Sequence, residues 1–166
     1  MSKKIARAGV IGASTLALTL ALSGCSLLGG VLGGGGADRG DDGQVTETAE
    51  DSVFAVQVGD CLNEPDGTEV SDVELIPCAE PHDYEVFDEL ELPEGDFPSD
   101  IEDQAKEFCE GDAFTEFVGV DYGSSQLYAT YFVPTQDGWE QQDDRLIQCI
   151  IYDQEPTAGT LAGSNK

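Results

Sequence analysis

Hydrophobic and polar positions follow a strand-like pattern in three stretches of the first half of the chain. Residues 54–58, 70–76 and 84–92 place apolar side chains at about every second position, and Gly, Pro or Asp residues close each stretch. Two later runs, 127–133 and 146–152, are rich in apolar, β-branched and aromatic residues on both faces. This composition favours central strands that a helix covers on one side.

Between the third and fourth predicted strands the period changes from two to about 3.6, which indicates a helix. Ser99 and Glu102 have the spacing of a capping box, and the apolar residues of 101–109 would share one helical face. Asp112 would cap a further turn that ends before Gly119. The order of elements predicts an α+β fold, a small antiparallel sheet of about five strands with one helical layer.

The first 24 residues have the layout of a secretory signal peptide. Basic residues among the first seven precede an apolar run over residues 10–22, which falls short of the roughly 20 residues that a membrane-spanning helix needs. Leu22-Ser23-Gly24-Cys25 resembles the lipobox of bacterial lipoproteins. That resemblance implies cleavage before Cys25 and a lipid on its thiol, so the partner at this end would be the outer face of the cell membrane.

The remaining chain divides into three parts by composition. Residues 25–52 are Gly-rich and then acidic, which is typical of a flexible linker that follows a lipidated N-terminus. Residues 53–152 are long enough for one globular domain with one core. Residues 153–166 are polar and contain Pro and Gly, and we expect a disordered tail.

The chain is strongly acidic, with 34 acidic and 7 basic residues and a net charge of −27. Cleavage before Cys25 would remove three of the basic residues and none of the acidic ones, so that the net charge becomes −30. Such a surface repels nucleic acid and anionic lipid headgroups. Nucleic acid is therefore excluded as a partner, and an envelope protein or a cell-wall component remains.

Four cysteines follow Cys25, and they can form two disulfides in an oxidising compartment: Cys61, Cys78, Cys109 and Cys149. Three connectivities are possible. Pairing of the first two would close a short loop, and pairing of the last two would join a helix to a strand, so we favour this arrangement. The spacings lack the Cys-x-x-Cys pattern of zinc sites, and we expect neither a metal nor a cofactor.

His82 is the only histidine, so a catalytic triad or a metal site would have to include it, with Glu85 close by. The serines of 123–125 lack the Gly-x-Ser-x-Gly form of a nucleophile elbow. We favour a structural role in which the imidazole bonds the backbone in the turn after Cys78. A contact that responds to pH is the alternative, because an unperturbed histidine titrates near pH 6.5.

Arg145 and Trp139 are two further candidate binding residues. Arg145 lies among carboxylates and is expected to form a structural ion pair with Asp144, Asp60 or Glu85, or else to recognise an anionic group. Trp139 is placed in the loop between the last two strands. It would be either a lid on the core or an exposed anchor for a partner.

One dense motif carries a resemblance to a known family. The residues Pro77-Cys78-Ala79-Glu80-Pro81-His82-Asp83-Tyr84-Glu85-Val86 come after Val58-Gly59-Asp60-Cys61 and before Cys109, Phe117-Val118-Gly119, Pro134, Trp139, Asp144-Arg145 and Cys149. In this order they resemble the septum formation-related domain of actinobacterial membrane proteins and lipoproteins, over nearly all of residues 53–152. One departure is Asp143, where the family pattern would have glycine before the Asp-Arg pair.

The resemblance implies an accessory domain of the cell envelope, related to division septa, with no established catalytic activity or ligand. Together with the lipobox, it predicts a lipid-anchored extracytoplasmic protein that acts by binding. The alternative function is a hydrolase or metal-dependent enzyme of the envelope, centred on His82.

Overall fold

The computed structural model describes residues 36–67 and 70–166. The expected signal peptide, residues 1–24, and the expected lipidation site at Cys25 lie outside the described residues. No helix in the described part of the chain is long and apolar enough to span a membrane.

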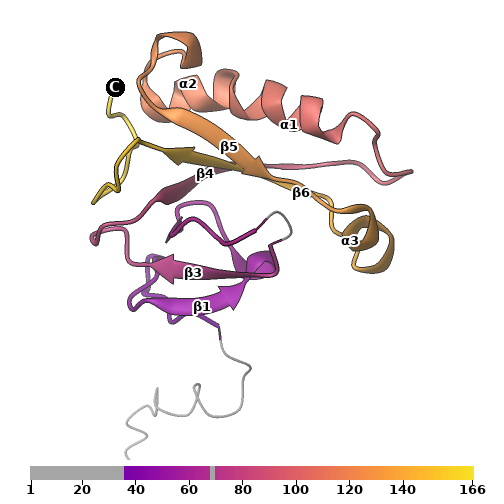
Figure 1. The fold of residues 1–166 in the computed structure, drawn as a ribbon, viewed down its shortest axis with the longest axis horizontal. Helices are drawn as coiled ribbons and strands as arrows, with labels where there is room; N and C mark the ends of the chain where they lie inside the picture. The colour runs from indigo at the N-terminus through magenta and orange to yellow at the C-terminus, as the bar shows by residue number, and fades with distance from the viewer. Residues whose placement is uncertain (1–35, 68–69) are drawn as a thin grey trace, which may run out of the picture. The chain divides into compact units, whose positions relative to one another are not determined.

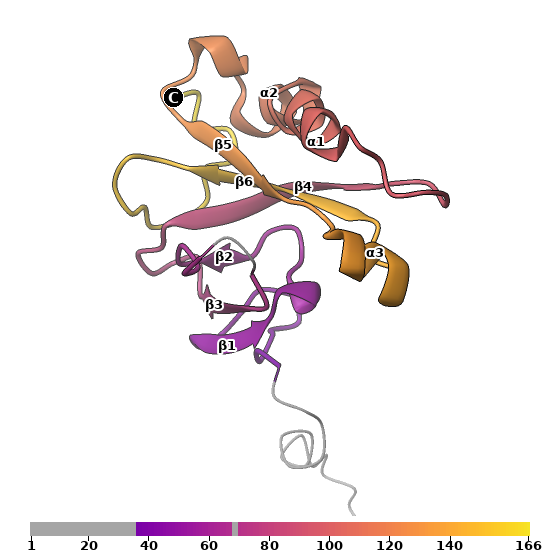
Figure 2. The ribbon, with the colours of Figure 1, turned by 45° about the vertical axis from the view of Figure 1, so that its right-hand side comes forward.

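Six antiparallel strands form one sheet in the order β1-β3-β2-β4-β6-β5 (Figure 1). The strands are β1 (Ala49–Ser52), β2 (Cys61–Leu62), β3 (Asp72–Ile76), β4 (Tyr84–Glu91), β5 (Tyr128–Phe132) and β6 (Leu146–Tyr152). The long strands β4 and β6 lie in the middle, and β1 and β5 lie at the two edges. The sheet curls, so that β1, β2 and β3 turn away from the plane of β4, β5 and β6 (Figure 2).

Helices cover one face of β4, β5 and β6 (Figure 2). They are α1 (Ile101–Cys109) and α2 (Asp112–Val118), and a third helix, α3 (Gln136–Gln141), joins β5 to β6. Ile101, Ala105 and Cys109 are the buried residues of α1, three or four positions apart as one helical face requires. Gly119 ends α2 with a φ of 95°, in the left-handed region that a glycine adopts without strain.

The side chains of β4 and β6 point alternately into two hydrophobic cores. On the helical side, Phe87, Ile147 and Ile151 pack with residues of α1 and α2. On the other side, Val86 and Ile150 pack with residues of β2 and β3. The predicted α+β class is therefore confirmed, and the helical layer and the curled part of the sheet each bury one face of the central strands.

Three elements differ from the prediction. Residues 54–58 form no strand, because Ser52 caps a 3-10 helix, η2 (Val53–Ala55), through its hydroxyl, which accepts a hydrogen bond from the backbone N–H of Phe54. The strand predicted at 127–133 lies at an edge and not in the centre. The helix predicted from the Ser99 capping box begins after Asp100, with no side-chain cap.

The end of the expected linker is packed against the domain, in contrast to the flexible spacer predicted for residues 25–52. β1 pairs with β3, and Val45 is buried. The guanidinium of Arg39 donates two hydrogen bonds to the two carboxylate oxygens of Asp60, which is 2% exposed. A bidentate bond of this kind fixes both partners. This hydrogen bond is also the main reason why the pKa of Arg39 is raised.

The tail expected to be disordered, residues 153–166, is likewise packed. Thr157 and His82 form a β-bridge, and Leu161 is buried in the core between the helices and the sheet. The backbone N–H of Asn165 donates to the carbonyl of Val118 at 2.9 Å. The polar composition of the tail did not reveal these contacts, because most of them are made by the backbone.

Both expected disulfides are present. Cys61 and Cys78 are 17 residues apart, and Cys109 and Cys149 are 40 residues apart. The first bridge ties β2 to the turn before β4. The second joins the end of α1 to β6 inside the helical core, where both cysteines are fully buried.

We predict that the Cys109–Cys149 bridge stabilises the fold more than the Cys61–Cys78 bridge. In the loop-entropy relation, loops of these lengths give about 4 and about 3 kcal/mol respectively. The double variant Cys109→Ala with Cys149→Ala should therefore lose more free energy of unfolding in urea than Cys61→Ala with Cys78→Ala, which serves as the matched control. An equal or smaller loss would contradict this ranking.

Candidate functional site

His82 is enclosed by the protein and does not face a cleft. Its side chain is 1% exposed, and Nδ1 lies 2.8 Å from the backbone oxygen of Glu80. A carbonyl oxygen only accepts, so Nδ1 carries the proton and donates it. The backbone N–H and C=O of His82 both bond Thr157. The predicted structural role, an imidazole bonded to backbone in the turn after Cys78, agrees with this geometry.

Glu85 holds the C-terminal segment. Its carboxylate is 3% exposed and accepts hydrogen bonds from the Thr160 hydroxyl and from the backbone N–H of Leu161, the latter at 2.7 Å. A buried carboxylate needs such partners, because its desolvation is costly. The two bonds therefore position Leu161 at the core, and this carboxylate faces the tail and not a substrate.

Trp139 and Arg145 form one cluster at α3. The indole is 4% exposed, and its N–H donates to the backbone oxygen of Gly95 at 2.9 Å. The Arg145 guanidinium carbon lies 3.9 Å from the indole ring centroid, as in a cation–π contact. Of the two roles left open for Trp139, the structure favours the lid on the core, and the loop expected around it is a helix.

The ion pairs of Arg145 differ from the expected ones. Its guanidinium pairs with Asp143 at 2.9 Å and with Glu94 at 3.9 Å. From Asp144 it takes only the backbone oxygen. The other two expected partners, Asp60 and Glu85, are occupied elsewhere. Asp143 has a φ of 58°, which explains why a glycine would fit this position. Asp143 is thus a left-handed residue that also supplies a carboxylate to Arg145.

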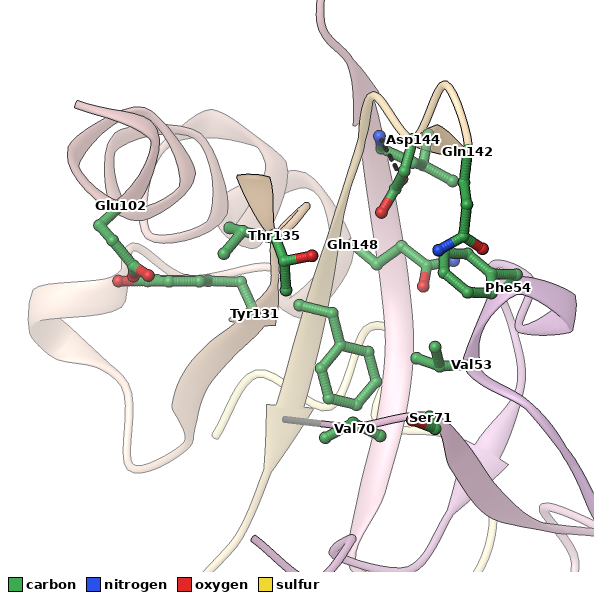
Figure 3. A pocket seen from close by; sticks show the side chains of 13 residues that line it. Val53, Phe54, Val70, Ser71, Glu102, Tyr131, Thr135, Gln142, Asp144 and Gln148 are labelled. Carbon is green, nitrogen blue, oxygen red and sulfur yellow. Dashed lines mark hydrogen bonds between the residues drawn. The ribbon is translucent and has the colours of Figure 1, made fainter. Parts of the chain in front are cut away.

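A cleft with a volume of about 530 Å³ lies elsewhere, at the C-terminal end of β5 (Figure 3). Its lining residues come from the segment around η2, the start of α1, β5, the loop around α3, and β6: Val53, Phe54, Val70, Ser71, Glu102, Tyr131, Phe132, Val133, Thr135, Gln142, Asp144, Leu146 and Gln148. The sequence candidates His82, Glu85, Trp139 and Arg145 are absent from this lining. Sequence reasoning therefore missed the cleft.

The cleft has an apolar part and an acidic part. Phe54 is 59% exposed, and Phe132, which is half-buried, also lines the cleft. On the other side, Glu102 of α1 lies beside the hydroxyl of Tyr131 (Figure 3). Burial and the hydrogen bond with this carboxylate raise the pKa of Tyr131. The apolar part thus offers surface for a side chain, and the acidic part offers an acceptor for a donor or a cation.

Gln148 forms the floor between these parts. It is buried, and its amide nitrogen donates to the backbone oxygen of Val56 at 2.9 Å. This bond joins β6 to the chain after η2, across 92 residues of sequence. A sequence signal for this part of the cleft is the uncharged aromatic pair at 131–132, within the run 127–133 that the sequence predicts as a central strand.

A second, smaller cleft of about 240 Å³ is acidic and aromatic. Its lining residues are Glu64, Asp83, Tyr84, Tyr152, Asp153, Gln154, Glu155 and Pro156. The rings of Tyr84 and Tyr152 lie 5.4 Å apart, and so do those of Tyr152 and Tyr128. Asp153 is paired with Lys166, whose ammonium lowers the pKa of this carboxyl. Among the described residues, no group of three or more His, Cys, Asp and Glu side chains has the geometry to hold a metal ion.

The chain was compared with models of known protein families. The family described as "Septum formation" matches residues 58–165, which is well over half of the chain. The chain therefore belongs to this family, and the resemblance inferred from the motifs is confirmed. Neither a curated protein nor a solved structure matches the chain significantly.

We predict a late tyrosine ionisation in the second cleft. Burial, followed by a hydrogen bond to Glu64, raises the pKa of Tyr84 from 10.0 to about 12. Because the folded state holds this proton more tightly than the unfolded state, the stabilisation is present below pH 10 and is lost as the pH rises toward 12. Absorbance at 295 nm should show a step near pH 12 that Tyr84→Phe removes. The same late step in Tyr84→Phe would contradict the assignment.

Proposed function

We propose that this chain is a membrane-anchored extracytoplasmic lipoprotein whose domain acts by binding, without catalysis, in the cell envelope during septum formation. Membership of the septum formation family is the observation that carries the link to septation. The sequence of the N-terminus and the geometry of the domain support the other parts of the proposal.

The lipid anchor is supported by residues 1–25. A basic start, a short apolar run and Leu22-Ser23-Gly24-Cys25 are the sequence features of an exported lipoprotein. Two disulfides in the domain fit an oxidising compartment, because thiols in the cytoplasm are kept reduced. Both features favour the outer face of the cell membrane.

A binding role fits the domain better than catalysis by His82. An enzyme centred on this residue would need an imidazole that substrate can reach, and here Nδ1 donates to backbone while the ring is buried. The nearby carboxylate of Glu85 is taken up by the tail. The four cysteines of the domain are all in disulfides, so none of them is a thiol nucleophile. The alternative of a hydrolase or metal-dependent enzyme gains no support from this arrangement.

The cleft beside β5 is the best surface for a binding function. It combines an exposed aromatic ring, Phe54, with carboxylates at its rim and a buried floor. Large apolar side chains in a recess are the kind of group that dominates binding energy at interfaces.

We predict that Cys25→Ser abolishes lipidation, because the hydroxyl does not replace the thiol in forming the thioether. Cells labelled with palmitate should incorporate label into the wild type and into Ser26→Ala, the matched control, but not into Cys25→Ser. The variant should also accumulate unprocessed or leave the membrane fraction. Normal labelling of Cys25→Ser would disprove the anchor.

We predict that deletion of this chain changes the placement or timing of septa. Cell length and septum position would be measured by microscopy of cells stained for nascent cell wall. Wild type expressed from a second locus should restore the normal distribution, and His82→Ala at wild-type abundance should restore it too if the histidine is structural. An unchanged length distribution in the deletion strain would count against a role in septation.

A further inference from the structure

The outer edge of β5 has unpaired backbone groups. The backbone N–H of Leu92, next to the end of β4, donates to the backbone oxygen of Arg145, just before β6. Because backbone N–H and C=O groups alternate in direction along a strand, those of the odd-numbered residues of β6 point toward β4 and those of the even-numbered residues point toward β5. The bonds of Val86 support this assignment. Its backbone N–H and C=O bond Asp60 and Gly59 on the β2 side, so they do not bond Ile150, the even-numbered residue opposite it in β6.

It follows which residues of β5 face outward. The even residues of β6 pair with 128, 130 and 132, so the N–H and C=O groups of Ala129 and Tyr131 point away from the sheet. Among the described residues, no backbone hydrogen bond from outside the ladder reaches either of them. Such an edge is a template for another strand.

This edge lacks the usual protection against pairing. Natural sheets protect their edges with charged residues or proline. β1, the opposite edge, carries Glu50 and Asp51 among its four residues. Residues 127–133 of the β5 run contain neither a charge nor a proline. The two edges of the same sheet therefore differ in their readiness to pair.

The 530 Å³ cleft adjoins the unprotected edge at its C-terminal end, where Tyr131 and Phe132 line it, and reaches both faces of the sheet. Phe132 and Gln148 lie on the face away from the helices, together with Phe54. Tyr131 lies on the helical face beside Glu102 (Figure 3). Since successive side chains of a strand point to opposite faces, an added strand would place apolar side chains near Phe54 and the alternate ones near Glu102.

The charge of the cleft indicates which kind of chain can bind at this edge. The lining includes the carboxylates of Glu102 and Asp144 and no lysine or arginine. The negative charges of Asp103 and Glu110 also contribute to the raised pKa of Tyr131. A second copy of this chain would bring the same negative charge, −27 in all, to the interface, whereas a basic segment would be attracted.

We propose that the outer edge of β5 binds an extended basic segment of a partner protein by strand addition, with apolar side chains of that segment in the cleft. This inference rests on the proposed function only in that the domain acts by binding. It names the chemistry of the partner and the residues that contact it.

The test uses the full-length chain in lipid nanodiscs and a fluorescent peptide of seven alternating lysines and valines. Two further peptides carry N-methyl groups, one on every valine amide and the other on every lysine amide. Because the amides of alternate residues point to opposite edges of a strand, one methylated peptide should bind like the parent, and the other should bind at least tenfold more weakly in fluorescence anisotropy. Equal affinity of all three peptides would overturn strand addition.

Three variants of the chain locate the site. Ala129→Pro removes an outward N–H and places a ring on the edge, so the affinity should fall at least tenfold, whereas Ala129→Ser keeps the N–H and should bind like the wild type. Phe54→Ser should weaken binding at least tenfold with no change in thermal unfolding, since this ring is largely exposed. If Ala129→Pro does not fold, Phe54→Ser and the methylated peptides still decide the question, and unchanged affinity in Phe54→Ser would overturn the assignment to the cleft.

Charge and self-association provide the remaining outcomes. A glutamate–valine peptide should not bind, and Glu102→Gln should weaken the lysine–valine peptide; equal binding of both peptides would overturn the basic partner. A chain dimer in sedimentation that Ala129→Pro dissociates would identify a second copy as the occupant and would also overturn it. Peptide binding is measured without cells, so normal septation in the deletion strain combined with the expected binding would refute the proposed function alone. Altered septation without peptide binding would refute only the strand addition.

Discussion

The antiparallel pair of β4 and β6 is the constraint on which the other parts of the fold depend. β6 is buried on both faces, and so is the first half of β4; their alternating side chains supply Phe87 and Ile147 to the helical core and Val86 and Ile150 to the core of the curled sheet. A shift of register by one residue would exchange the two sets. Such a shift would also move Cys149 away from Cys109, so the disulfide and the two cores favour the same register.

Buried carboxylates attach the first and the last described segments of the domain to this centre. The carboxylate of Asp60 accepts hydrogen bonds from Arg39, on its N-terminal side. The carboxylate of Glu85 accepts them from the hydroxyl of Thr160 and the backbone N–H of Leu161, on its C-terminal side. Removing one partner of such a buried charge costs more than the bond itself contributes, because the other partner is left without compensation. In a chain with 34 acidic residues, most carboxylates keep the surface soluble, but these two hold the segments around Arg39 and Leu161 against the domain.

The sequence predicted the elements that local signals specify. The alternation of 84–92, the apolar run of 146–152 and the Gly119 end of α2 each contain enough information within a few residues. It did not predict that 127–133 lies at an edge, because strand order depends on pairings between distant segments. The cleft was missed for the same reason: its floor requires Gln148 to meet the carbonyl of Val56, and no local pattern encodes this contact. His82 and Glu85 were recognisable in the sequence by residue type and spacing. Their burial depends on the C-terminal tail, which bonds them largely through its backbone, and backbone bonds cannot be inferred from composition.

The acidity of the chain and the neutral edge of β5 are best understood together. An uncharged run with three aromatic residues and an open backbone edge is an aggregation hazard in an ordinary protein. Here two copies repel each other as they approach within the screening length, about 8 Å at physiological salt, before their edges can pair. The same field attracts a basic chain and raises its rate of encounter. The β5 edge, which would promote aggregation on a neutral domain, thereby stays available to partners of opposite charge. The negative surface repels acidic strands and attracts basic ones.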